Sequence, residues 1–123
     1  MKRYVAEEGS DIVRAAMQEA DGWFMCRIGF VETARAVSLA AGERVVRGFR
    51  REWPSFGVIE LDQRLAERAA GLATAGVLRS LDSLHLAAAL VLPRGDLFLA
   101  TWDRRLHQAA TEQGLRVLPE RLA

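Results

Sequence analysis

The chain has 123 residues, 50% of them hydrophobic and 27% charged, which predicts one soluble domain able to bury a core without metals or disulfides. Its formal net charge of +1 gives no overall field toward nucleic acid or a membrane, and no apolar run approaches the roughly 20 residues that span a bilayer. The single cysteine, Cys26, excludes an internal disulfide and suits a reducing, cytoplasmic setting.

The first half of the chain predicts helices that alternate with short strands. Ser10 is a plausible N-cap for the first helix, Gly42 ends the second, and Pro54 ends the third. The strands show as short apolar stretches, one of them marked by a β-branched pair. The expected elements are helices at residues 12–20, 27–41 and 43–53 and strands at 23–26 and 57–61.

The second half continues the alternation. Asp62 is a suitable cap for a helix that runs to Gly76, and the helix over residues 81–92 is apolar on nearly every side, which predicts a central, buried position. The remaining expected elements are a strand at residues 96–101, a helix at 103–113 and a strand at 115–118. Helices alternating with short apolar strands predict an α/β fold with a mainly parallel sheet, as one domain over residues 1–123. In such sheets, ligands bind beyond the carboxyl ends of the strands.

Three acidic residues stand where the apolar pattern does not call for a solvated charge. They are Glu32, Asp82 and Asp103. A carboxylate among apolar neighbours is costly to ionise unless a partner offsets its charge, and a hard cation such as Mg²⁺ or Mn²⁺ is one such partner. Metal ions held in this way can activate a water and stabilise the charge of phosphodiester cleavage.

Ordinary structural roles remain open for the same acids. Asp103 is also a suitable N-cap for the helix that follows it, and Asp82 is suited to cap its own helix. Glu32 has the helical spacing to pair with Arg35 or Arg27. Spacing alone therefore does not identify a site.

Four segments of the chain resemble motifs of the PIN-domain proteins of the VapC toxin type. They read KRYVAEEGS (2–10), FVETARA (30–36), LDSLHLAAA (81–89) and TWDRRL (101–106). Their order and spacing agree over essentially the whole chain. The resemblance implies a PIN-like three-layer α/β/α sandwich and an Mg²⁺- or Mn²⁺-dependent endoribonuclease that cleaves RNA. It also implies a homodimer and a cognate antitoxin, and it makes Glu32, Asp82 and Asp103 the catalytic, metal-binding acids.

The start of the chain departs from the pattern of that family. The family begins with a strand that ends in a metal-binding Asp, whereas this sequence has Met1 directly before Lys2. We therefore expect the first, central strand to be missing from the sequence given, which makes the domain N-terminally incomplete. One hypothesis is a start misassigned at a GUG codon, which in-frame translation of the upstream DNA tests. The alternative is a catalytically impaired PIN remnant that binds an antitoxin or RNA without cleavage.

Other polar residues have both a functional and a structural interpretation. His85 is suited to assist at the site or to form a hydrogen bond in the core, and Ser83 and Thr101 are suited to orient the acids or bound waters. Four arginines on the helix over residues 43–53 are suited to contact RNA phosphates or to form a solvated face beside Glu43 and Glu52. They are Arg44, Arg47, Arg50 and Arg51.

Overall fold

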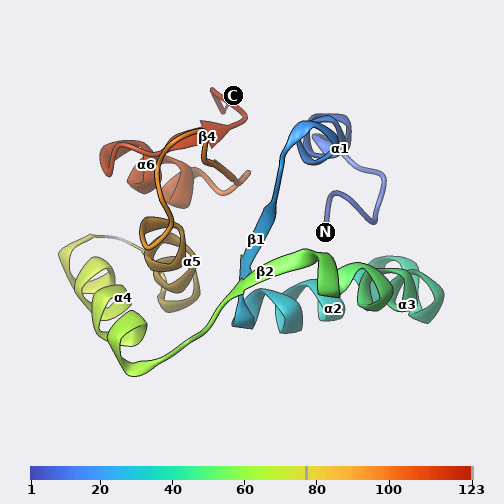
Figure 1. Cartoon of the computed structure of the whole chain (residues 1–123), viewed down its shortest axis with the longest axis horizontal. Coiled ribbons are helices and arrows are strands. Elements are labelled where there is room, and N and C mark those ends of the chain that lie inside the picture. The colour runs from blue at the N-terminus through green and yellow to red at the C-terminus, as the bar shows by residue number, and fades with distance from the viewer. Residues whose placement is uncertain (77, 123) are drawn as a thin grey trace. The chain divides into compact units, whose positions relative to one another are not determined.

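The computed structural model describes residues 1–76 and 78–122, and the chain divides into two compact units, residues 1–59 and 60–123. The first unit contains α1 (Ser10–Glu19), β1 (Trp23–Cys26), α2 (Arg27–Ala41), α3 (Glu43–Glu52), the short 3-10 helix η1 (Trp53–Ser55) and β2 (Phe56–Ile59) (Figure 1). The second unit contains α4 (Gln63–Ala75), α5 (Ser80–Leu90), β3 (Phe98–Ala100), α6 (Arg104–Glu112) and β4 (Arg116–Leu118).

The sheet of the first unit is a parallel pair of strands. β1 lies beside β2, with Phe24 opposite Gly57. The Phe24 ring covers this glycine so closely that a Cβ atom at position 57 would lie 2.6 Å from the ring. The absence of a side chain at Gly57 therefore leaves the space that the ring occupies beside the neighbouring strand.

An aromatic cluster forms the core of the first unit. Phe49 on α3 is completely buried, and its ring centroid lies 5.1 Å from that of Tyr4, 5.4 Å from that of Phe30 and 5.7 Å from that of Trp53. Trp23 packs against Phe56 at 5.5 Å. Because aromatic rings bury large apolar areas and prefer tilted or offset contacts, this cluster holds α2, α3 and the strands together.

The start of α1 differs from the expectation by one residue. The N-cap is Gly9, which adopts a left-handed backbone with φ of 88°, and Ser10 is the first helical residue. The buried Ser10 hydroxyl does not cap the helix; it accepts from the Glu7 amide and donates to the Val5 carbonyl, each at 2.9 Å. Glycine tolerates the positive φ that the turn requires. The Ser10 side chain instead holds the preceding loop, through its hydrogen bonds to Val5 and Glu7.

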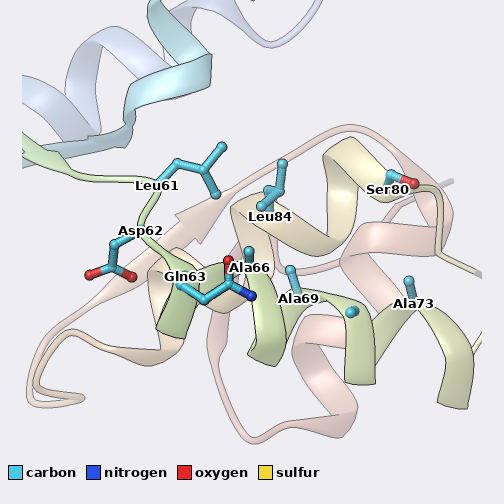
Figure 2. Close-up of a pocket in the computed structure, with 9 residues that line it drawn as sticks. Leu61, Asp62, Gln63, Ala66, Ala69, Ala73, Ser80 and Leu84 are labelled. Atoms are coloured by element: carbon cyan, nitrogen blue, oxygen red, sulfur yellow. The ribbon is translucent and has the colours of Figure 1, made fainter.

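The second unit is built around α5, which packs against α4 and α6, and around the parallel pair β3–β4. Its buried core consists of Leu78, Leu86, Leu106, Ala110 and Leu115. Between α4 and α5 lies an open depression of about 490 Å³ with mostly small side chains, including Ala66, Ala69 and Ala73, along its wall (Figure 2). The sequence predicts that α5 is buried. This is confirmed for the middle of α5, whereas Leu81 in its first turn is 43% exposed.

The expected α/β class with parallel strand pairing is confirmed by both sheets. Within residues 1–76 and 78–122, each sheet has two strands. Two expectations stay predictions: that the first, central strand of the family is missing, and that the chain forms a single domain. Along the same residues, no helix combines the length and apolar character needed to cross a membrane.

Candidate active site

Asp103 lies directly after β3, at the start of α6, in the second unit. Its Oδ1 atom accepts the Leu106 amide at 2.9 Å, so the N-cap role expected for Asp103 is confirmed. The Thr101 hydroxyl oxygen accepts the Asp103 amide at 3.2 Å, which fixes the backbone on the other side of the carboxylate. Asp103 is exposed, and only Oδ1 takes part in the cap, so the carboxylate is accessible to a ligand.

Asp82 lies in the first turn of α5 and is half-buried. The N-cap position belongs to Arg79, so the expectation that Asp82 caps its helix is wrong. The unpaired amides of a first turn carry partial positive charge, which favours a carboxylate at this place. The neighbouring Ser83 is 1% exposed, and its hydroxyl donates to the Arg79 carbonyl at 2.9 Å. The Ser83 hydroxyl proton therefore forms a hydrogen bond within the helix and is not donated to a carboxylate or a water.

Glu32 lies on α2 in the first unit, where its side chain is half-buried. The next residue, Thr33, is 9% exposed and faces Met25, with 3.9 Å between the Thr33 hydroxyl oxygen and the Met25 sulfur. Glu32 therefore lies at the border between the buried and the solvent-facing sides of the helix. This is a position from which a carboxylate can reach a ligand at the surface.

The chemistry of these side chains fits a hard divalent cation, because all three offer carboxylate oxygen. The second unit holds two of them, Asp82 and Asp103, on helices that pack against each other. Across the described residues, no group of three or more His, Cys, Asp or Glu side chains forms a ready metal cluster. Mg²⁺ commonly uses one or two carboxylates together with waters and substrate phosphates, so Asp82 and Asp103 are of the right chemical type to be its ligands.

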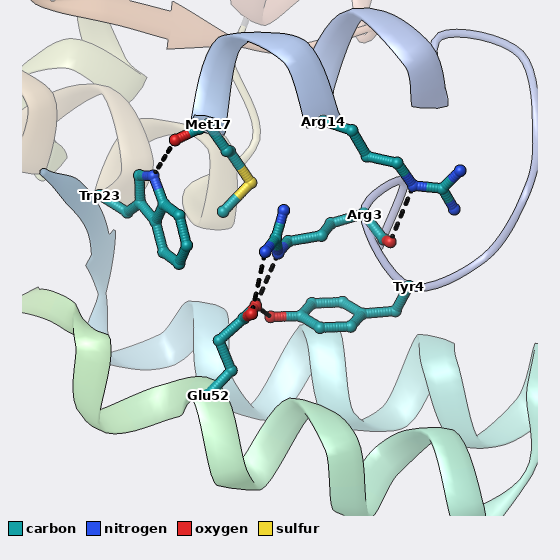
Figure 3. A network of polar contacts seen from close by, with 6 residues as sticks. All are labelled: Arg3, Tyr4, Arg14, Met17, Trp23 and Glu52. Atoms are coloured by element: carbon teal, nitrogen blue, oxygen red, sulfur yellow. Dashed lines mark hydrogen bonds and ion pairs between the residues drawn. The ribbon is translucent and has the colours of Figure 1, made fainter. Parts of the chain in front are cut away.

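A network that sequence reasoning missed joins the N-terminal segment to the end of α3 (Figure 3). Arg3 donates to both carboxylate oxygens of Glu52, at 2.6 and 2.9 Å, and the Tyr4 hydroxyl donates to Oε1. The Arg3 guanidinium also lies over the Trp23 ring, 4.7 Å from its centroid. Glu52, the acid expected beside the arginines of this helix, is thus hydrogen-bonded within the network, and its side chain is 27% exposed.

The network changes the acid–base properties of its members. The hydrogen bonds from Arg3 are the main reason that the pKa of Glu52 lies below its ordinary value, and they raise the pKa of Arg3. Burial, with a further contribution from the Glu52 carboxylate, raises the pKa of Tyr4 far above that of a free tyrosine. All three groups therefore keep their usual charge at neutral pH. The partners lie 48 and 49 positions apart, so no local spacing in the sequence signals them.

The α/β units with parallel strands, and the acids at the start of α6 and in the first turn of α5, agree with a sequence match to the PIN domain over residues 4–112. The chain belongs to the PIN domain family, as the resemblance predicted.

Similar proteins place it within that family among the VapC-type PIN ribonucleases. Ribonuclease VapC45 of Mycobacterium tuberculosis (strain CDC 1551 / Oshkosh) is 33% identical over 131 aligned residues, covering 99% of this chain and 91% of the relative. Ribonuclease VapC49 of strain ATCC 25618 / H37Rv has the same identity and coverage. Ribonuclease VapC46 of the latter strain is 30% identical over 118 residues, covering 96% of this chain and 89% of the relative.

Proposed function

We propose that this chain is a metal-dependent endoribonuclease of the VapC type, which cleaves RNA phosphodiester bonds with a metal-activated water. The observation that carries the proposal is the similarity to proteins named ribonucleases, which extends over 91% and 89% of the length of those relatives. The acids Glu32, Asp82 and Asp103 support it, because they offer the oxygen ligands that such chemistry needs.

In this proposal, Asp82 and Asp103 of the second unit hold a divalent ion, and Glu32 is a further metal-binding acid that the sequence motif predicts. When bound, Mg²⁺ or Mn²⁺ lowers the pKa of a coordinated water and offsets charge on the phosphate. The chain's own contribution is to fix the ligands. The Leu106 amide holds Oδ1 of Asp103, and Thr101 holds its backbone amide, so the carboxylate keeps one orientation without the metal. A ligand that is already oriented loses less conformational entropy when the ion binds.

The test compares two aspartates that cap helices in the same way. Asp62 accepts the Leu65 amide at 2.8 Å, as Asp103 accepts that of Leu106 at 2.9 Å. Asn is as good an N-cap as Asp, so Asp62→Asn and Asp103→Asn each remove one charge and keep the cap. We expect Asp103→Asn and Asp82→Asn to lower Mg²⁺-dependent cleavage of a labelled RNA about 100-fold or more, and Asp62→Asn to leave it unchanged. Full activity of purified Asp103→Asn would contradict the proposal.

Titration calorimetry with Mn²⁺ separates this proposal from the catalytically impaired alternative. A working site binds the ion, and Asp82→Asn weakens the binding. A folded chain that neither binds Mn²⁺ nor cleaves RNA would instead support the remnant that binds without cleavage. The antitoxin and the homodimer remain predictions, to be tested by purification of the native complex and by light scattering.

A further inference from the structure

Helix α3 carries four exposed arginines on one side: Arg44, Arg47, Arg50 and Arg51. At about 3.6 residues per turn, they occupy roughly a third of the helix circumference. Val46 and Phe49, which are 3% and 0% exposed, face the core instead. We call the four side chains the arginine face of α3.

The acids of the same helix do not neutralise this face. Glu43 has the spacing to pair with Arg47, but its carboxylate accepts the Ser38 hydroxyl at 2.8 Å. Glu52 is held by Arg3 and Tyr4. Within the part of the chain that the structure describes, no carboxylate lies within ion-pair distance of any arginine of the face.

One arginine of the face is oriented by an aromatic ring. The guanidinium of Arg50 lies 5.3 Å from the centroid of the Phe30 ring, a contact that steadies the side chain and leaves its charge in place. At about 1.5 Å of rise per residue, the row from Arg44 to Arg51 is about 10 Å long. A row of positive charges along one side of a helix suits a polymer with regularly repeated anions, and the planar guanidinium is well matched to phosphate oxygens.

We propose that the arginine face of α3 binds the phosphate backbone of the RNA substrate. This inference rests on the proposed function, and it assigns substrate positioning to a surface outside the three acids. With a net charge of only +1, the chain has no general attraction for RNA, so a local cluster must supply it.

The experiment measures binding of a fluorescein-labelled single-stranded RNA by fluorescence anisotropy, across a KCl series and in EDTA so that no cleavage occurs. The test variant is Arg47→Ala/Arg51→Ala. The matched control is Arg64→Ala/Arg68→Ala, which removes the same charge from an exposed side of α4. Each lost phosphate contact lowers the slope of log K against log [salt] by about 0.7. We therefore expect a slope reduced by about 1.4 in the test variant and unchanged in the control.

A charge-preserving variant separates folding from binding. Arg47→Lys/Arg51→Lys is expected to retain most of the wild-type slope, because lysine keeps the charge and loses only the planar fork. An unchanged slope in the alanine variant, or an equal loss in the α4 control, would overturn the proposal. The proposal would also be overturned if Arg47→Ala/Arg51→Ala bound RNA normally but bound labelled polyglutamate more weakly than the wild-type chain does. That result would indicate that the arginine face binds an acidic protein.

The cleavage assay keeps the two proposals distinguishable. If the wild-type chain binds RNA through the arginine face but does not cleave it in Mg²⁺, the nuclease proposal fails and this one stands. If the wild-type chain cleaves RNA but the salt slope of the alanine variant is unchanged, only the proposal about the arginine face is overturned.

Discussion

Arg3 and Glu52 form a two-point contact between residues 49 positions apart, with Nε 2.6 Å from Oε1 and Nη2 2.9 Å from Oε2. The Tyr4 hydroxyl donates to the same Oε1 atom. Paired guanidinium–carboxylate contacts combine charge with fixed geometry, so they order both partners. The contact therefore fastens the N-terminal segment to the end of α3 and withdraws one acid from the surface.

The stability of the chain should depend on Glu52 at acid pH. Because its pKa is lowered in the folded state, the contribution of Glu52 is fully present above its ordinary value of 4.5 and is lost as the pH falls through the folded value. Glu52→Gln should cost about 1 kcal/mol at neutral pH and flatten the decline in acid, as measured by urea unfolding. Glu43→Gln, on the same helix, serves as the control. An unaltered acid profile in Glu52→Gln would show that the contact does not stabilise the fold.

The capping role of Asp103 should be separable from its charge. Asp103→Ala removes the acceptor of the Leu106 amide and should lower the free energy of unfolding by about 1 kcal/mol, whereas Asp103→Asn should change it little. The same pair of substitutions at Asp62 should behave alike, because it caps α4 in the same way. Chemical denaturation checks all four variants. Equal destabilisation by Asn and Ala at position 103 would mean that charge, not capping, is the stabilising factor.

A divalent ion should stabilise the fold through Asp82. A ligand that binds only the folded state raises stability by mass action, so Mg²⁺ or Mn²⁺ should raise the melting temperature of the wild-type chain, and EDTA should reverse the change. Asp82→Asn should reduce this shift, and Asp62→Asn should preserve it. A shift of the same size in all three proteins would point to nonspecific ion binding at other acids.

Phe49 should be the most sensitive apolar position of the first unit. It is completely buried and touches three other rings, so Phe49→Ala should cost about 3 to 5 kcal/mol, and Phe49→Leu should cost less. Leu39 on α2 is 72% exposed, and Leu39→Ala should change stability by no more than about 0.5 kcal/mol. Urea unfolding followed by tryptophan fluorescence provides the comparison. Equal effects at the two positions would contradict the assignment of the core.

Helices were predictable where a local signal marks their ends. Gly42, with φ of 83°, ends α2 at the expected residue, and Asp62 caps α4 as expected. The ends of strands were predicted less accurately. The strand expected over residues 96–101 extends only over Phe98–Ala100. A strand lasts only as long as its partner pairs with it, and that partner is distant in sequence. The Ser10 cap failed because the preceding Gly9 adopts the turn more easily.

The candidate site, like the fold, was predictable only where a local sequence signal exists. The sequence motifs identify Glu32, Asp82 and Asp103 as candidates, and the local spacing also predicts the capping geometry of Asp103 that the structure shows. The pairing of Glu52 with Arg3 was not predictable, because it depends on tertiary folding across 49 positions. Without that pairing, the arginine face of α3 would have a second acid beside it.

The contact between Phe24 and Gly57 has a consequence for how β1 and β2 align. A slip of one residue would turn the side chains of a strand to the opposite face and would place Phe56 or Val58 where the glycine now lies. Any side chain there begins with a Cβ atom, and the Phe24 ring occupies that space. The glycine therefore favours the observed alignment of the two strands, because either neighbouring alignment would require the Phe24 ring to move.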